Sequence, residues 1–131
     1  QISPVSRFSA RWRFISCTVA RCAHLPLGRW HPIRGLAARV AALAPDIALL
    51  PVNGRDEARS SNGVPCNFTL DEAVALVRAA GVPSLLAHHY GLFDFNTVAP
   101  SLIDERAARE TASGGLQMRR ARQQNTLRLQ R

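Results

Sequence analysis

Two short apolar runs with a helical pattern between them occupy the middle of the chain. Residues 46–50 and 84–87 are of the kind found in interior strands, and Pro83 opens the second run. Thr69, with Glu72 three residues later, forms a capping-box pattern for a helix that Gly81 ends. The apolar positions of this helix recur at helical spacing: Ala73, Leu76, Val77 and Ala80.

The order strand, helix, strand predicts an α/β fold with a parallel sheet. A right-handed crossover brings the carboxyl ends of both strands to the same edge of that sheet. Two polar segments, residues 53–56 and 88–90, follow these strand ends. Because such folds bind ligands at this edge, we expect the two segments to form the functional site.

The flanking segments carry weaker patterns. Residues 35–43 predict a short helix that Pro45 closes, and residues 100–110 predict a polar helix. The residues expected to face the core are Leu36, Val40 and Leu43 in the first helix, and Leu102, Ile103 and Ala107 in the second. Residues 55–66 form a loop long enough to be functional. After residue 115 the tail is basic and weakly patterned, and residues 126–129 are either a terminal edge strand or disordered.

Charge is distributed unevenly along the chain. Residues 1–45 contain seven arginines and no carboxylate, whereas residues 46–110 contain all nine acidic residues and five arginines. With five more arginines in the tail, the three parts carry about +7, −4 and +5, which gives the net charge of +8. The chain has no lysine. We therefore divide it into an irregular basic segment (1–34), a central domain (35–113) and a basic tail (114–131).

The cysteine content and the hydropathy pattern favour a cytoplasmic protein. Three widely spaced cysteines do not form a disulfide framework. No apolar run approaches the length needed to span a membrane, and the basic start lacks the features of a signal peptide. We therefore expect no membrane partner.

Candidate site residues lie at the expected sheet edge. If the second strand continues, His88 and His89 point to opposite faces, so one of them can enter a site; a solvated His pair is the alternative. Arg55 is placed either to clamp an anionic substrate group or to pair with a neighbouring carboxylate. Asn53, two residues earlier, is a further candidate for substrate binding. Tyr90 either lines the pocket or packs.

Three separated blocks resemble a known family. Pro-Asp-Ile-Ala-Leu-Leu-Pro-Val-Asn-Gly-Arg-Asp, Asn-Phe-Thr-Leu-Asp-Glu-Ala and His-Tyr-Gly-Leu-Phe-Asp-Phe-Asn-Thr occur in order between residues 35 and 104. Together they resemble the C-terminal part of metallo-β-lactamase-fold hydrolases of the ascorbate-6-phosphate lactonase type. The resemblance implies a partial αββα sandwich, a C-terminal strand–helix–strand portion of which is present here. It also implies a zinc or manganese site with His89 as its last ligand, His88 being the second choice, and a small anionic substrate.

Most of the ligand motif that the resemblance implies is missing from this chain. Members carry an upstream His-x-His-x-Asp-His cluster and a Gly-Asp pair, and neither occurs here. A catalytic metal site needs about three protein ligands and an open position. We therefore interpret the chain as a fragment of a metal-dependent hydrolase, of lactonase or sugar-phosphate ester type, that is inactive and binds no metal alone.

The first 34 residues suggest an explanation for the missing motif. Back-translating residues 25–34 and shifting the frame by one nucleotide permits Tyr-His-Ser-Gly-Asp-Gly-Thr-Pro-Tyr-Glu, which leads directly into Gly35. This restores the Gly-Asp pair of the resemblance. We therefore hypothesise that the basic segment before Gly35 is read out of frame, which the encoding DNA sequence would test.

A non-enzymatic function is the competing hypothesis. The two basic ends would allow an Arg-rich protein to bind nucleic acid with strong salt dependence. No aromatic residues alternate with the arginines and the central part is acidic, so we do not favour a nucleic-acid partner. Half of a two-sheet sandwich leaves an open strand edge, which predicts poor solubility or homo-oligomers.

Overall fold

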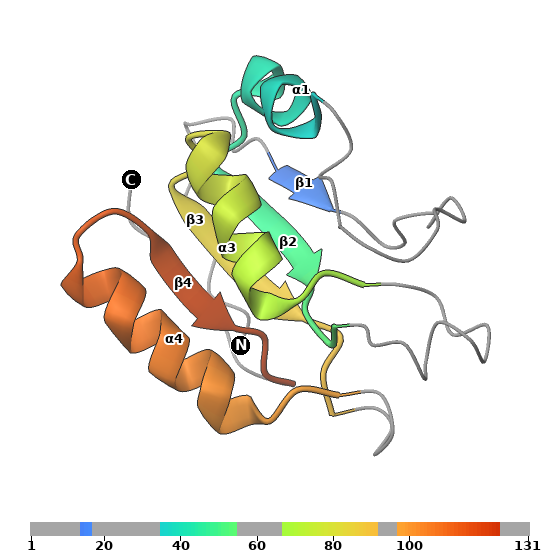
Figure 1. Ribbon diagram of the computed structural model, residues 1–131, viewed down its shortest axis with the longest axis vertical. Coiled ribbons are helices and arrows are strands. Elements are labelled where there is room, and N and C mark those ends of the chain that lie inside the picture. Colours follow the sequence, from blue (N-terminus) through green and yellow to red (C-terminus); the bar gives the residue numbers. More distant parts are fainter. Residues whose placement is uncertain (1–13, 17–34, 55–66, 92–96, 124–131) are drawn as a thin grey trace, which may run out of the picture.

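The computed structural model describes residues 35–54, 67–91 and 97–123 in full and residues 14–16 by their backbone. The elements are β1 (Phe14–Ser16), α1 (Leu36–Leu43), β2 (Ile47–Pro51), α3 (Leu70–Ala79), β3 (Ser84–His88), α4 (Pro100–Ala112) and β4 (Gln117–Arg120). The four strands form one parallel sheet in the order β1-β2-β3-β4. The predicted α/β class with a parallel sheet is therefore confirmed (Figure 1).

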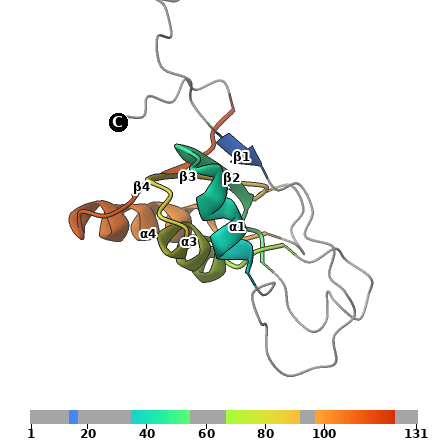
Figure 2. The same ribbon diagram turned by 90° about the horizontal axis from the view of Figure 1, so that it is seen from above.

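The helices cover one face of the sheet, as the view from above shows (Figure 2). Strand residues that are almost fully buried alternate with more exposed ones, which is the period of a strand with one covered face. The covered positions are in register across the strands: Ala48 with Leu85, Leu50 with Ala87, and Leu85 with Met118. The core of the described chain lies between these residues and α3 and α4, which contribute Val74, Val77 and Ile103.

Helix α3 begins and ends where the sequence predicts. The Thr69 hydroxyl accepts from the Glu72 backbone N–H at 3.2 Å, and the Glu72 carboxylate accepts from the Thr69 N–H at 2.9 Å. Gly81, with φ of 68°, takes the left-handed conformation that ends the helix at little steric cost. The capping box predicted from the sequence is thus confirmed.

The predicted helices α1 and α4 are also present, but the prediction that Leu43 and Leu102 face the core is wrong. Leu43 is 59% exposed and Leu102 is 51% exposed. In α4 the inward face contains Ile103, Ala107 and Glu110, which follow one another at intervals of four and three residues. Leu102 precedes this stripe by one residue, a rotation of roughly 100° that turns it to solvent.

Two strands, β1 and β4, lie at positions where the sequence predicted no strand. β1 belongs to the basic segment 1–34, and β4 belongs to the basic tail 114–131. In β4 Met118 is the buried residue, with arginines after it, so the apolar signal is one residue wide. The loop 55–66 and the proposed edge strand 126–129 lie outside the described residues. Among the described helices, none has the length and apolar character needed to cross a membrane.

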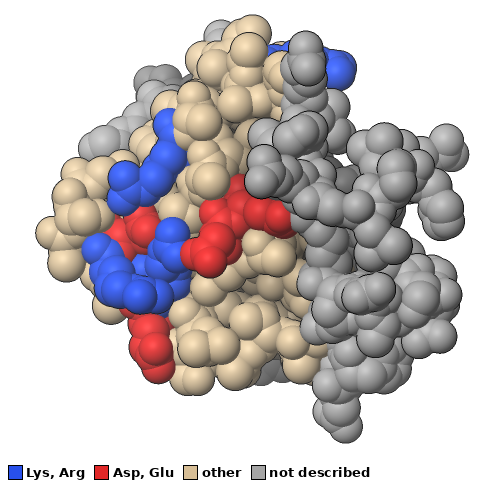
Figure 3. All heavy atoms as spheres, viewed as in Figure 1, with Lys and Arg blue, Asp and Glu red and all other residues tan. Residues whose placement is uncertain are grey.

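Ion pairs join α3 to α4. Glu110, almost fully buried, accepts from the Nε–H of Arg78 at 2.9 Å and from the Nε–H of Arg106 at 2.7 Å. Arg106 also pairs with Asp71 at the start of α3. Acidic and basic side chains accordingly lie side by side over these two helices (Figure 3).

Candidate functional site

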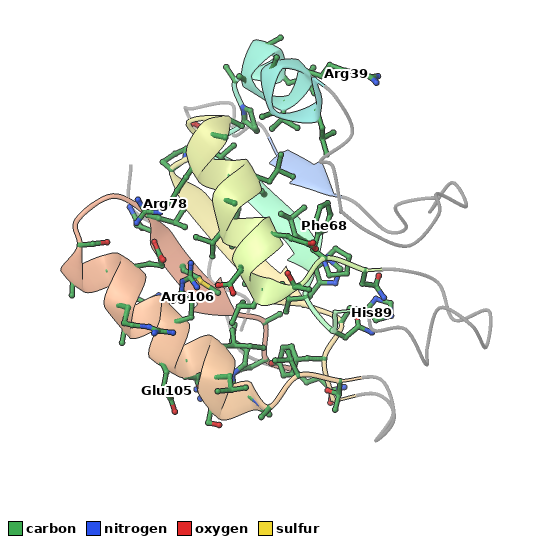
Figure 4. All side chains as sticks on the ribbon, viewed as in Figure 1. Arg39, Phe68, Arg78, His89, Glu105 and Arg106 are labelled. Atoms are coloured by element: carbon green, nitrogen blue, oxygen red, sulfur yellow. The ribbon has the colours of Figure 1, made fainter. Side chains whose placement is uncertain are left out.

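The carboxyl ends of β2 and β3 meet at one edge of the sheet, as predicted. Pro51 is in register with His88, and the Val52 N–H donates to the His88 carbonyl at 3.0 Å. The Gly54 N–H donates to the Phe68 carbonyl at 2.9 Å, which brings the segment before α3 to the same edge. Phe68 and His89 are seen at this end of the sheet in Figure 4.

Asn53 and Asn67 are the buried polar residues of this edge. Only 3% of Asn53 and 7% of Asn67 is exposed. They directly precede Gly54 and Phe68, whose backbone hydrogen bond joins the turn after β2 to the start of α3. The substrate-binding role predicted for Asn53 remains a prediction. Arg55, the second predicted substrate contact, lies outside the described residues.

His88 is half-buried at the last position of β3. Since Ala87 faces the helices, strand alternation directs His88 to the opposite face of the sheet. Its pKa is lowered, first by burial and then by the charge of His89, against a hydrogen bond with the Leu49 backbone that raises it. The neutral imidazole, which is the form that ligates metals, is therefore favoured at His88.

His89 follows directly and differs in conformation and exposure. Its φ is 64°, a left-handed conformation that is uncommon for a residue with a side chain, and its side chain is exposed. This conformation ends the strand, and the two imidazole centroids lie 6.0 Å apart. Strained backbone of this kind is concentrated at functional sites, so it makes His89, which unlike the other described non-glycine residue with positive φ, Ala44, carries a metal-ligating side chain, the candidate ligand.

Tyr90 contacts the end of β4. Its hydroxyl donates to the Ala121 carbonyl and accepts from Nη1 of Arg120 at 3.3 Å. The Arg120 guanidinium also lies over the Tyr90 ring, 5.4 Å from its centroid. The substrate-binding role predicted for Tyr90 stays a prediction, while its packing partners come from a strand that the sequence did not reveal.

The metal-ligand donors of the described residues do not complete a metal site. In residues 35–54, 67–91 and 97–123 no three His, Cys, Asp or Glu side chains are grouped so that they could hold a metal ion. His88 and His89 together fall short of the roughly three protein ligands that a catalytic site requires. Any further ligands must come from outside this part of the chain, and no reaction step through a metal follows from it.

The fold is similar to part of a metallo hydrolase. The solved structure is Igni18, described as a novel metallo hydrolase from the hyperthermophilic archaeon Ignicoccus hospitalis, with a TM-score of 0.51 and 17% identity. The similarity covers 69% of this chain and 33% of Igni18, so the chain spans about a third of that protein. No protein-family model and no curated protein matches the chain. The likeness shows a partial metallo-hydrolase-type α/β fold.

Proposed function

We propose that this chain is the C-terminal part of a metal-dependent hydrolase acting on lactones or sugar-phosphate esters. His89 is its metal ligand, and the other ligands are supplied from beyond the described residues. The observation that carries this proposal is the left-handed His89 at the carboxyl end of β3, in a fold similar to part of a metallo hydrolase. Asn53 and Arg55 are proposed to contact the anionic part of the substrate.

The face of the sheet opposite the helices supports the proposal of a larger two-sheet structure. Leu49 and Leu86 are in register on this face and remain partly exposed. The described helices α1, α3 and α4 all lie on the other side of the sheet (Figure 2). Parallel sheets normally have both faces covered, so a second layer is expected here. In the αββα sandwich implied by the resemblance, that layer is the other sheet.

A site-resolved zinc titration tests the ligand assignment. Zinc added to the purified chain should shift the ring resonances of His89 in NMR spectra, with weak affinity because the ligand set is incomplete. His89→Ala should abolish the effect, and His88→Ala, the matched control on the adjacent residue, should retain it. A response carried by His88 alone would refute the assignment. Tight stoichiometric zinc with lactone or phosphoester turnover would refute the proposal that the chain is inactive alone.

Nucleic-acid binding is the alternative function, and the described ion pairs do not favour it. Arg78, Arg106, Arg120 and Arg122 each lie within ion-pair distance of a carboxylate. Arginines engaged in this way contribute less to phosphate binding, which depends on the charge that they present to the backbone of the nucleic acid. Tight, steeply salt-dependent DNA binding that is indifferent to zinc would support this alternative over the hydrolase.

A further inference from the structure

The left-handed conformation of His89 is held between two fixed points of the backbone. Before it, the His88 carbonyl accepts from the Val52 N–H at 3.0 Å, which fixes the end of β3 against β2. After it, the Gly91 N–H donates to the Thr97 hydroxyl. The left-handed conformation is strained for an L-residue, so interactions nearby must maintain it.

A third interaction is made by Tyr90, the residue that follows His89. Its hydroxyl donates to the Ala121 carbonyl, and the Ala121 N–H donates to the Ala87 carbonyl at 2.8 Å. The Tyr90 side chain is thus hydrogen-bonded to the backbone of Ala121, and the backbone of Ala121 is hydrogen-bonded to β3. The side chain spans the turn and fixes the direction in which the chain leaves the sheet.

Arg120, the last residue of β4, contacts Tyr90 as well. Its guanidinium lies over the ring and donates to the hydroxyl, and it forms a two-point pair with Asp104 of α4. The two Arg120–Asp104 hydrogen bonds are 2.9 Å and 2.7 Å long. Planar two-point pairs of this type restrict the orientation of both partners. We call Tyr90, Arg120 and Asp104 the Tyr90 anchor.

We infer that the Tyr90 anchor positions His89 by holding its backbone in the left-handed conformation. This inference rests on the proposed role of His89 as a ligand, and makes Tyr90 and Arg120 positioning residues for it. The anchor directs the His89 imidazole away from β3 at a fixed angle. Without the anchor, the turn relaxes to an unstrained conformation and the imidazole points elsewhere.

A double-mutant cycle in metal-free protein tests the coupling. In the parent chain His89→Gly should stabilise the protein and lower its unfolding equilibrium constant about threefold. Glycine removes the backbone strain, but the greater entropy of glycine in the unfolded chain offsets part of that stabilisation. In the Tyr90→Phe background, where the ring stays and the hydroxyl is lost, that gain should vanish. Unfolding constants are compared at a common urea concentration within the transition, so no extrapolation is needed.

Ala44 provides the matched control. It also has a positive φ, 44°, but lies after α1 and away from the anchor. Ala44→Gly should therefore give the same gain in both backgrounds. Asp104→Asn supplies a second anchor variant if Tyr90→Phe does not fold. Its control is Asp71→Asn, which removes an ion pair between α3 and α4 that is not part of the anchor.

Each outcome of the cycle decides the inference. A His89→Gly gain that is equal with and without the anchor, or no gain in the parent chain, overturns it. A gain lost only in the anchor variants supports it. The zinc titration is independent of this result. If the His89 resonances do not respond to zinc, the ligand proposal is refuted. If the stability effects of the two mutations are additive, the anchor is refuted and the ligand assignment is unaffected.

Discussion

Glu110 of α4 links the two helices of the helix layer through its arginine partners. It accepts hydrogen bonds from Arg78 on α3 and Arg106 on α4 while almost fully buried. Burial opposes its ionisation, but the hydrogen bonds and charges of the two arginines outweigh burial and lower its pKa below the usual 4.5. Hydrogen bonds to a charged group contribute roughly 1.5–3 kcal/mol. Arg78, whose side chain is 49% exposed, contributes less than Arg106, whose side chain is 21% exposed.

Glu110→Gln should therefore lower the free energy of unfolding by about 2 kcal/mol at pH 7. A lowered pKa means that this stabilisation is fully present above the unfolded-state pKa and is lost as the pH falls through the folded-state pKa. The difference between parent and variant, measured by urea unfolding, should thus shrink as the pH falls below 4.5. Glu105→Gln, on the exposed face of α4, is the control and should change stability by less than about 0.5 kcal/mol. A Glu110→Gln penalty that does not change with pH would show that the charge is not what stabilises the pair.

Three further perturbations have defined outcomes. Thr69→Ala should cost about 1 kcal/mol of stability, because it removes the capping box of α3. Thermal unfolding followed by circular dichroism should show a lower melting temperature, and an unchanged melting temperature would contradict the assignment. Ala44→Gly should stabilise the chain by up to about 1 kcal/mol in urea unfolding, and destabilisation would mean that Ala44 is not left-handed in solution. The face of the sheet opposite the helices, on which Leu49 and Leu86 lie, is called the helix-free face, and it is expected to cause self-association. Leu86→Lys should reduce this self-association in sedimentation measurements, whereas Leu102→Lys, on the solvent side of α4, should not. Equal effects of the two substitutions would place the contact elsewhere.

The sequence predicted best those elements whose signals are local. The capping residues of α3 and the continuous apolar runs of β2 and β3 each specify an element within a few residues. β4 lacks such a signal, because Met118 alone faces the core and its pairing with Leu85 depends on residues more than thirty positions away. The exposure of Leu102 was mispredicted because apolar neighbours left the orientation of α4 open by one position.

The site shows the same division between local and distant information. The position of His88 and His89 at a sheet edge follows from the strand that precedes them, and the structure places them there. The conformation of His89 and the partners of Tyr90 depend on β4 and α4, so the sequence left the packing of Tyr90 unresolved. Arg120 and Asp104 were missed because nothing near them in the sequence indicates that they meet the residue after His89.

The helix-free face distinguishes the two histidines. His88 projects to the same face as Leu49 and Leu86, so a second sheet packed there would cover His88 along with them. Further burial lowers the pKa of His88 further and removes it from solvent, which makes it a packed neutral side chain. His89 lies beyond the end of β3, and its left-handed backbone takes it out of the strand alternation, with its side chain exposed. In the proposed two-sheet hydrolase, His89 is therefore the imidazole that stays available to a metal when the structure is complete.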